Sequence, residues 1–378
     1  MTTIKDPTTA PPFFEGMELE LAVEKLAFGG KALGRVGGFV VFVDHGLPGQ
    51  TLRAKITRKK AQFAEARVIE LLSQSPAYEP PFCPHFGLCG GCQWQDLAYE
   101  EQLHWKGVHV QECLKHLAGL GPRIIQPAVA SPHQRHYRNK MEFSFAPGAW
   151  VEPQEAAAQG SPGNGCALGL HVGHDPSRIF NLEHCFLQSA QSPAIVQEVR
   201  RWCEASRLPA YNPKTRQGFW RFLVVREGKR TSETLVHIIT TAQGDKNAVD
   251  KLAGHLQSRF PGITTLVHSQ SRKKAQVATG EVSRTLFGPG YIEEKLGQLR
   301  FQISAQSFFQ PNTLAAEGLY AAISGLAELT GQETVWDLYC GAGGIGLSVA
   351  AQVRRVVGFE LMAAALADAV TNCRLNGI

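Results

Sequence analysis

The fold is decided by the stretch from residue 334 to residue 346, Thr334-Val335-Trp336-Asp337-Leu338-Tyr339-Cys340-Gly341-Ala342-Gly343-Gly344-Ile345-Gly346. It begins as an apolar run typical of a buried strand and ends with four glycines in six residues. The apolar segment 347–353 that follows predicts a helix. A strand, a tight glycine turn and a helix start bring backbone N–H groups close to a ligand, because glycine has no Cβ. The pattern therefore predicts a site for a nucleotide-like cofactor.

A second apolar strand, over residues 355–359, ends in Glu360, which is placed to accept hydrogen bonds from ribose hydroxyls. Three of the glycines also satisfy G-x-G-x-x-G, so a dinucleotide is an alternative, as is a glycine turn without a ligand. Asp337 would repel a pyrophosphate but can pair with the cationic methionine part of S-adenosylmethionine (SAM). The motif also lies near the end of the chain, whereas dinucleotide fingerprints often open their domain. We therefore favour SAM.

Length and composition indicate an ordinary globular protein of two or three domains. The chain has 378 residues, of which 44% are hydrophobic and 19% charged, and its net charge is +5. No window approaches 18 uninterrupted apolar residues, so we expect no transmembrane helix and no membrane partner. The polar, proline-rich start lacks the apolar core of a signal peptide. We expect a disordered leader over residues 1–13 and a cytoplasmic protein.

Residues 14–72 alternate short β-like runs with glycine turns, at a spacing of roughly ten residues that is typical of a small β-barrel of the OB type. Five cations fall within eight residues of this segment: Arg53, Lys55, Arg58, Lys59 and Lys60. One interpretation is a solvated hairpin edge, since edge strands often carry lysine. The other is a barrel that binds RNA through a basic lip and exposed aromatics such as Phe39 and Phe63.

A loop of three cysteines follows, with Cys83, Cys89 and Cys92 in the spacing C-x5-C-x2-C. The two glycines before Cys92 let the backbone curl so that N–H groups point at sulfur. Neither a second C-x2-C nor a Cys/His pair lies nearby, so the fourth ligand must be distant, and Cys185 is the best candidate. Nine cysteines without a secretion signal argue against a disulfide framework. This spacing suits a [4Fe–4S] cluster as well as zinc.

The middle of the chain, residues 73–290, predicts an α+β domain. A helix is expected over residues 96–118, starting at Asp96, and further helices and strands follow over residues 192–268. Within this domain, cations interleaved with aromatics run into an alternating strand, a pattern suited to phosphate contacts and base stacking. The residues expected to contact RNA there are Arg135, Tyr137, Arg138 and Lys140. The run Arg272-Lys273-Lys274 gives a further basic point, which alone would be a solvated turn.

Taken together, these stretches resemble the SAM-dependent RNA (uracil-5-)-methyltransferases that carry an N-terminal TRAM domain and a [4Fe–4S] cluster, mostly known to modify 23S rRNA. The resemblance covers the chain from about residue 14 to its end. Besides the cysteine spacing, it rests on three motifs: Tyr137-Arg138-Asn139-Lys140, Phe308-Phe309-Gln310-Pro311-Asn312 and Asp337-Leu338-Tyr339-Cys340-Gly341. It implies a multidomain α/β protein: a TRAM barrel over 14–72, the central α+β domain, and an incomplete Rossmann-like SAM domain over 291–378.

The resemblance also implies iron rather than zinc at Cys83, Cys89, Cys92 and Cys185, with SAM contacts at Gln310, Tyr339, Gly344 and Glu360. Relatives often carry asparagine where this chain has Gly344, which has no side chain to make such a contact. With the glycine motif, the expected cofactor-binding residues are Gln310, Asp337, Tyr339, Gly341, Gly343, Gly344 and Glu360. The implied partner is RNA, rRNA of the 23S class before tRNA, and we expect a monomer. The radical-SAM methylthiotransferases also combine a TRAM domain with a cluster. They differ from this chain in their cysteine spacing, C-x3-C-x2-C, and in the C-terminal position of their TRAM domain.

In this family a cysteine thiolate adds to C6 of uracil, and a carboxylate base later removes the C5 proton. Both residues lie beyond an aspartate-proline-proline motif that follows the second helix of the SAM domain. This sequence ends at Ile378 without that motif, so we expect a C-terminally truncated chain with no catalytic residue present, inactive alone. Cys340 and Cys373 are expected to pack rather than react. The alternatives are a non-catalytic iron–sulfur RNA-binding protein, a dinucleotide-dependent iron–sulfur oxidoreductase, and the same chemistry on tRNA.

Overall fold

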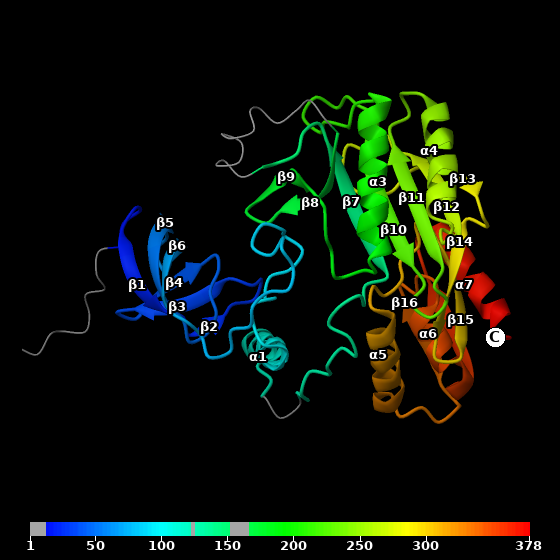
Figure 1. Cartoon of the computed structure of the whole chain (residues 1–378). Coiled ribbons are helices and arrows are strands. Elements are labelled where there is room, and N and C mark those ends of the chain that lie inside the picture. The colour runs from blue at the N-terminus through cyan, green and yellow to red at the C-terminus, as the bar shows by residue number, and fades with distance from the viewer. Residues whose placement is uncertain (1–12, 122–124, 152–165) are drawn as a thin grey trace, which may run out of the picture. The chain divides into compact units, whose positions relative to one another are not determined.

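The structure is a computed structural model that describes residues 13–121, 125–151 and 166–378 (Figure 1). It divides into two compact units, the first formed by Met1–Phe86 and Cys92–Ala130, the second by Gly87–Gly91 and Ser131–Ile378. The expected leader lies outside the described residues except for Phe13, which is buried with its ring stacked on Phe39 at 4.7 Å between centroids. Among the helices of the described ranges, none is long and apolar enough to cross a membrane.

The first unit contains a six-stranded sheet in the order β1-β5-β6-β4-β3-β2. Side chains of β5, which pairs with β1 and β6, alternate inward and outward, and its inward residues Leu52, Ala54 and Ile56 are buried. Gly34 of β3 approaches β1 so closely that a Cβ there would lie 2.2 Å from the carbonyl oxygen of Ala22. The β-rich character expected of this segment is present, and the strands have these bounds: β1 Glu18–Ala22, β2 Lys25–Leu26, β3 Ala32–Val36, β4 Phe39–Val43, β5 Thr51–Lys59 and β6 Phe63–Ser73.

Helix α1 (Tyr99–Ala118) belongs to the first unit rather than to the central domain in which it was expected. Trp105 joins the core of the six-stranded sheet, and the Nε2 atom of His109 lies 2.9 Å from the carbonyl oxygen of Leu26. The helix begins at Tyr99, so the prediction that Asp96 caps it is wrong. The helix belongs to the first unit because of these packing contacts, which cannot be predicted from the local sequence.

The second unit is built on a seven-stranded sheet in the order β13-β12-β11-β10-β7-β8-β9. Every neighbouring pair is antiparallel except β11 and β12, which run parallel. Figure 1 shows helices α3 (Gln191–Ser206) and α4 (Lys246–Arg259) on the same face of this sheet, as expected for an α+β domain. The strands are β7 Lys140–Ala146, β8 Ala167–Val172, β9 Asp175–Asn181, β10 Trp220–Glu227, β11 Thr234–Thr240, β12 Thr265–Gln270 and β13 Val282–Phe287.

The last part of the chain carries the expected strand–glycine turn–helix–strand. Strands β16 (Thr334–Leu338) and β17 (Arg355–Phe359) form a parallel pair, joined by α6 (Gly344–Val349) and a short 3-10 helix, η2 (Ala350–Gln352). Before them come the hairpin β14 (Tyr291–Leu296) and β15 (Leu299–Ser304) and helix α5 (Thr313–Leu326); α7 (Ala363–Leu375) ends the chain.

Helix α7 and the residue just after it satisfy one edge of β15 with side chains instead of a further strand. The backbone N–H groups of alternate β15 residues donate to carboxylate or amide oxygens, at 2.9 Å to Asp368, 2.7 Å to Asn372 and 2.9 Å to Asn376. These three residues are spaced four apart and so share one helix face. This polar stripe joins the hairpin to the β16–β17 element.

We predict that His237 makes stability fall in acid. Its side chain is fully buried in β11, with Nε2 at 2.7 Å from Ser269 Oγ, and burial, aided by Lys140, lowers its pKa to about 3. The unfolded chain binds a proton near pH 6.5 and the folded chain does not, so stability is lost as the pH falls below 6.5. The free energy of unfolding, measured by urea titration, should fall with decreasing pH more steeply in wild type than in His237→Gln. The difference in slope should be about 1.4 kcal/mol per pH unit between pH 6 and 4. If the free energy of unfolding depended on pH equally in both proteins, His237 would not be the group responsible.

Candidate functional site

The glycine turn after β16 is held in a backbone conformation that favours glycine. Gly341 and Gly343 have φ angles of 56° and 88°, and Gly343 precedes the first residue of α6. Tyr339 also has a positive φ, 65°, although it is not a glycine, and its side chain is 88% exposed. The N–H of Cys340 donates to the carbonyl of Phe359 at 2.9 Å, which fixes the turn to β17. Strain of this kind persists where the surrounding structure enforces it, often at binding sites.

Asp337 lies beneath this turn. Its side chain is buried, its Oδ2 accepts the N–H of Gly346 at 2.8 Å, and burial raises its pKa. Burial and the neighbouring Asp337 raise the pKa of Tyr320 to about 12, so that hydroxyl stays protonated. A Cβ at Gly344 would lie 2.5 Å from the Tyr320 hydroxyl oxygen. Glycine at position 344 therefore leaves room for Tyr320, and any contact from this residue to a ligand is a backbone contact.

Glu360 lies at the end of β17, beside the glycine turn. One carboxylate oxygen accepts the N–H of Gly341 at 3.0 Å, and the other accepts the N–H of Met362 at 2.8 Å. These backbone hydrogen bonds, that from Met362 first, lower the pKa of Glu360. Because a carboxylate oxygen can accept more than one hydrogen bond, both oxygens keep capacity for hydroxyl donors.

Asn139 joins two motifs that lie far apart in sequence. Its side-chain Nδ2 donates to the carbonyl of Gln310 at 2.7 Å and to Thr313 Oγ1 at 3.0 Å, and its backbone N–H donates to the carbonyl of Pro311 at 2.7 Å. The Asn139 side chain is buried, whereas Phe308, just before this segment, is 64% exposed. The basic-aromatic motif at 137–140 thus anchors the polar-aromatic motif at 308–312.

These elements enclose a hollow of about 90 Å³. Five of the seven residues expected to bind the cofactor line it: Gln310, Asp337, Tyr339, Gly341 and Gly344. The other two adjoin it, since Gly343 precedes α6 and Glu360 binds Gly341. Phe308, Phe309 and Tyr320 complete its apolar wall. Backbone N–H groups, a buried carboxylate and an exposed aromatic ring together suit a nucleoside that carries a cationic group.

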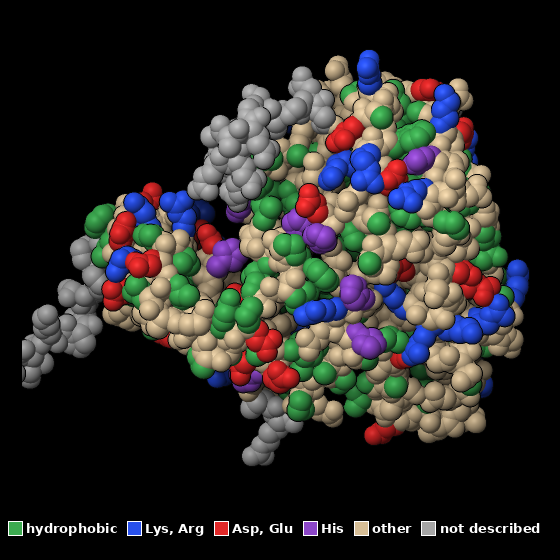
Figure 2. All heavy atoms as spheres, in the orientation of Figure 1, with side chains coloured by type: hydrophobic (Ala, Val, Ile, Leu, Met, Phe, Trp, Pro, Cys, Tyr) green, Lys and Arg blue, Asp and Glu red, His purple; other side chains and the backbone are tan. Residues whose placement is uncertain are grey.

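Four of the eight cations expected to contact RNA, Arg53, Lys55, Arg138 and Lys140, are engaged with neighbours. Arg53 pairs with Glu70 at 2.6 Å and Lys140 with Glu142 at 2.6 Å, while Lys55 lies 3.8 Å from Glu18. Arg138 Nε donates to the carbonyl of Lys140 at 3.1 Å. Figure 2 likewise shows Lys and Arg interspersed with Asp and Glu on the face drawn. Of the remaining expected residues, Arg58, Lys59, Lys60 and Arg135 are exposed and Tyr137 is half-buried.

The expectation that Phe39 and Phe63 are exposed is wrong. Phe39 packs against the core of the first unit and stacks on Phe13, and Phe63 meets Phe42 edge to face at 5.5 Å between centroids. Within the described ranges no ion pair involves Arg58, Lys59 or Lys60, at the β5–β6 hairpin. The end of this hairpin therefore carries three adjacent cations that no ion pair of the described residues neutralises.

Comparison with known proteins decides the family. Residues 12–69 match the TRAM domain model, and residues 232–378 match the model for tRNA (Uracil-5-)-methyltransferase. An uncharacterized RNA methyltransferase of Nitratidesulfovibrio vulgaris is 37% identical over 366 residues, which cover 97% of this chain and 75% of the relative. One from Chlorobaculum tepidum is 35% identical over 96% of this chain and 76% of its own length. The chain belongs to the tRNA (uracil-5-)-methyltransferase family of RNA methyltransferases.

A solved structure has the same fold as this family member. The tRNA (uracil-54, C5)-methyltransferase of Pyrococcus abyssi, crystallised with S-adenosyl-L-homocysteine, superimposes with a TM-score of 0.69 over 95% of this chain and 77% of its own. The two sequences are 23% identical.

The four cysteines expected to bind a cluster are divided between the two units of this methyltransferase-family chain. Cys83 and Cys92 belong to the first unit, Cys89 and Cys185 to the second. Cys89 Sγ accepts the N–H of Gly91 at 3.3 Å, so a glycine of the loop does direct a backbone donor at sulfur. Within the described residues, no group of three or more Cys, His, Asp or Glu is placed to hold a metal ion.

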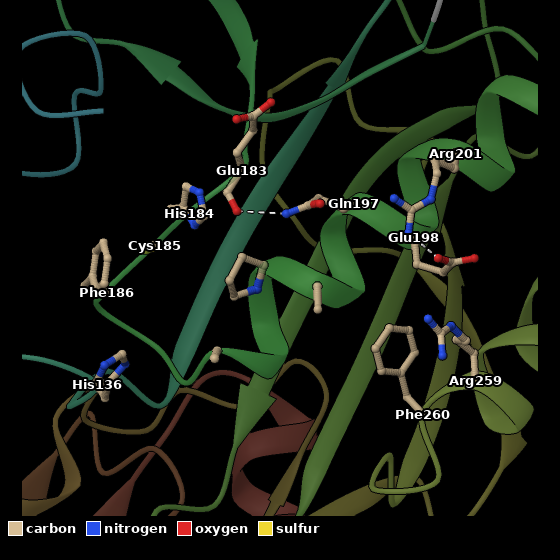
Figure 3. Close-up of a pocket in the computed structure, with 13 residues that line it drawn as sticks. His136, Glu183, His184, Cys185, Phe186, Gln197, Glu198, Arg201, Arg259 and Phe260 are labelled. Atoms are coloured by element: carbon tan, nitrogen blue, oxygen red, sulfur yellow. Dashed lines mark hydrogen bonds and ion pairs between the residues drawn. The ribbon is translucent and has the colours of Figure 1, made fainter. Parts of the chain in front are cut away.

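Cys185 borders a second hollow, of about 340 Å³, that the sequence did not suggest (Figure 3). Gln197 donates to the carbonyl of Glu183 at 2.8 Å and so ties α3 to the Cys185 segment. Arg201, Glu198, Arg259 and Phe260 form the opposite wall in the figure. No motif marks it, because its lining comes from four separate short segments.

Proposed function

We propose that this chain binds SAM in the hollow between the 308–310 segment and the glycine turn, for methyl transfer to C5 of a uridine in RNA. The observation that carries the proposal is the position of the buried Asp337 beneath a glycine turn that Glu360 closes. Membership of the family supports the reaction class. The P. abyssi enzyme of the same fold was crystallised with the demethylated product of SAM, which supports the choice of cofactor.

When bound, SAM supplies a methyl group activated by a sulfonium charge. Asp337, buried where charge interactions are stronger than in water, would hold the cationic methionine part. Glu360, ionised because of its lowered pKa, would accept hydrogen bonds from the ribose hydroxyls. The exposed ring of Phe308 at the rim would stack on a flat base. In this proposal Glu360 would hold the ribose and Asp337 would hold the charged methionine part.

Calorimetry with the purified chain tests the proposal against the dinucleotide alternative. We expect SAM to bind at one site per chain and NADH to give no heat, because Asp337 would face the pyrophosphate. Heat with NADH and none with SAM would overturn it.

We propose that methyl transfer uses a cysteine adduct at C6 and that Cys340 is not that nucleophile. Burial, together with the charges of Asp337 and Glu360, raises the pKa of the Cys340 thiol, which keeps it protonated. A Cβ at Gly358 would lie 2.9 Å from Cys340 Sγ, so this sulfur packs against β17. A covalent adduct trapped between the enzyme and a 5-fluorouridine RNA should therefore not involve Cys340. A crosslinked peptide that carries RNA on Cys340 would contradict this prediction.

We propose that the substrate is rRNA of the 23S type and not tRNA. The proposal rests on the cysteine spacing and the TRAM domain, which resemble those of the methyltransferases that modify 23S rRNA. Both the matching family model and the P. abyssi enzyme are named for tRNA, so tRNA is the direct competitor. A binding competition between 23S rRNA fragments and tRNA distinguishes them, and preference for tRNA would refute the rRNA assignment.

We propose that Cys83, Cys89, Cys92 and Cys185 hold a [4Fe–4S] cluster. Four thiolates are the usual ligand set of such clusters, and the N–H donor at Cys89 is of the kind that tunes them. We predict that the anaerobically purified chain is coloured and contains about four irons, and that each of these cysteines changed to serine loses both. Cys113→Ser, on α1, is the control and should keep them; a colourless wild type with bound zinc would refute iron.

A further inference from the structure

Arg221 is a buried cation that the proposed chemistry does not use. It lies in β10, where the register with β11 shifts between Trp220 and Phe222, and such a bulge re-aims a side chain. Its side chain is only 2% exposed, and its guanidinium lies 4.5 Å from the ring centroid of Tyr211. It donates to three backbone carbonyls of one loop: Lys273 at 2.8 Å, Ala275 at 3.1 Å and Ser271 at 3.4 Å.

The loop held in this way carries three consecutive cations, Arg272, Lys273 and Lys274, all exposed. The Arg272 N–H donates to Glu281 at 3.0 Å and the Lys273 amine donates to Thr279 Oγ1 at 2.8 Å. No ion pair neutralises any of the three within the described ranges. Glu281 attracts Arg221 and Lys273 and so offsets part of this positive charge. Arg221 fixes the backbone of the loop, and the three cations stay exposed.

The loop is also connected to the wall of the cofactor hollow. Ala278 packs with Phe222, Val224 and Ile239 on the sheet, and the N–H of Gly280 donates to Gln306 Oε1 at 3.0 Å. Gln306 also donates to Ser283 Oγ at 3.1 Å. Phe308, which lines the hollow, follows Gln306 by two residues. The end of the loop at Gly280 therefore contacts the segment that leads into one side of the hollow.

We propose that residues 271–275 form a preformed phosphate-binding loop for the RNA substrate, with Arg221 as its positioning residue. The inference rests on the proposed function, because it takes RNA as the substrate. Lysine and arginine presented from a fixed backbone bind phosphates without reading sequence, and they set the register of the strand. Next to the hollow, such contacts would hold the RNA backbone on one side of the target uridine.

The test measures RNA affinity by fluorescence anisotropy at several KCl concentrations, with a uridine-containing RNA oligonucleotide and the full 378-residue chain. R272Q/K273Q/K274Q should weaken binding about 10-fold or more at low salt and lower the salt slope by about one for each phosphate that the loop no longer neutralises. The matched control, K251Q/K295Q/R374Q, removes three exposed cations elsewhere and should change both quantities much less. If the two triple variants lost RNA affinity and salt dependence equally, the proposal would be overturned. The result would instead indicate general attraction of RNA by the net charge of the protein.

Arg221→Lys separates positioning from charge, because lysine keeps the cation but cannot reach three carbonyls at once. We expect it to weaken RNA binding about as much as Arg221→Met while SAM affinity stays at the wild-type value, which also shows that the variants fold. If Arg221→Lys bound RNA as tightly as wild type does, Arg221 would not be the residue that positions the loop. If wild type bound RNA but not SAM, the proposed function would fail while the loop assignment stood. Selective binding of an acidic peptide instead of RNA at this loop would refute the RNA assignment.

Discussion

Replacing Asp337 by asparagine should weaken SAM binding by about 100-fold, or about 2.7 kcal/mol. Asparagine keeps the shape of the side chain, and its amide oxygen can still accept the N–H of Gly346, which lies 2.8 Å from Oδ2. The change therefore removes mainly the negative charge. Since that carboxylate is buried, its attraction for a sulfonium or ammonium group is weakly screened. Calorimetry gives the affinity directly.

Two comparisons make this result specific. Adenosine, which has no sulfonium or ammonium group, should bind wild type and Asp337→Asn with similar affinity. Asp250→Asn, which breaks an exposed ion pair with Arg284, should leave SAM binding unchanged. Equal SAM affinity in Asp337→Asn and wild type would show that the carboxylate does not face the cationic part, and the orientation proposed here would be wrong.

The second large effect is expected at Asn139. Asn139→Ala removes two buried side-chain hydrogen bonds, one to the carbonyl of Gln310 and one to Thr313, and leaves a space in a buried site. Each unsatisfied buried group costs about 1–3 kcal/mol, so we expect the free energy of unfolding to fall by about 3 kcal/mol. SAM affinity should fall as well, because the same bonds fix the segment that carries Gln310.

Urea denaturation measures the first effect, and calorimetry at low temperature, where the variant stays folded, measures the second. Asn181→Ala is the control, since Asn181 is half-buried and its side chain accepts one hydrogen bond, from the N–H of Leu168 at 3.1 Å. It should cost about 1 kcal/mol and leave SAM binding intact. If the two variants were equally stable and bound SAM equally well, Asn139 would not be the link between the two motifs.

The features predictable from sequence were those encoded locally. The run from Thr334 to Gly346 specifies a strand, a turn with positive φ and a helix start within one continuous stretch. The alternation in β5 specifies which of its residues are buried. By contrast, Asn139 and Gln310 are 171 positions apart, and no local pattern predicts their hydrogen bond. The same holds for Arg221, whose partners lie 50 to 54 residues further on.

Charge was the property that the sequence described least well. Five cations in eight residues suggested a basic lip, but the register of β1 and β5 places Glu18 opposite Lys55 and Glu20 opposite Arg53. Cross-strand pairing therefore neutralises the first two cations and leaves the hairpin end. In the loop at 272–274 the opposite occurs, because a buried arginine holds the cations outward. Strand register and the anchoring of loops decide which cations remain free to contact a ligand. Neither can be read from the amino-acid composition.

The most direct test of the central claim is to locate the bound methyl donor on the chain. Ultraviolet crosslinking of methyl-labelled SAM to the purified protein, followed by peptide mapping, reports the residues that touch it. The account predicts label in the peptides containing Phe308 to Gln310 or Asp337 to Ile345, competed away by unlabelled SAM and reduced in Asp337→Asn. Specific label confined to any other peptide, or label in these peptides that NADH competes away, would contradict it.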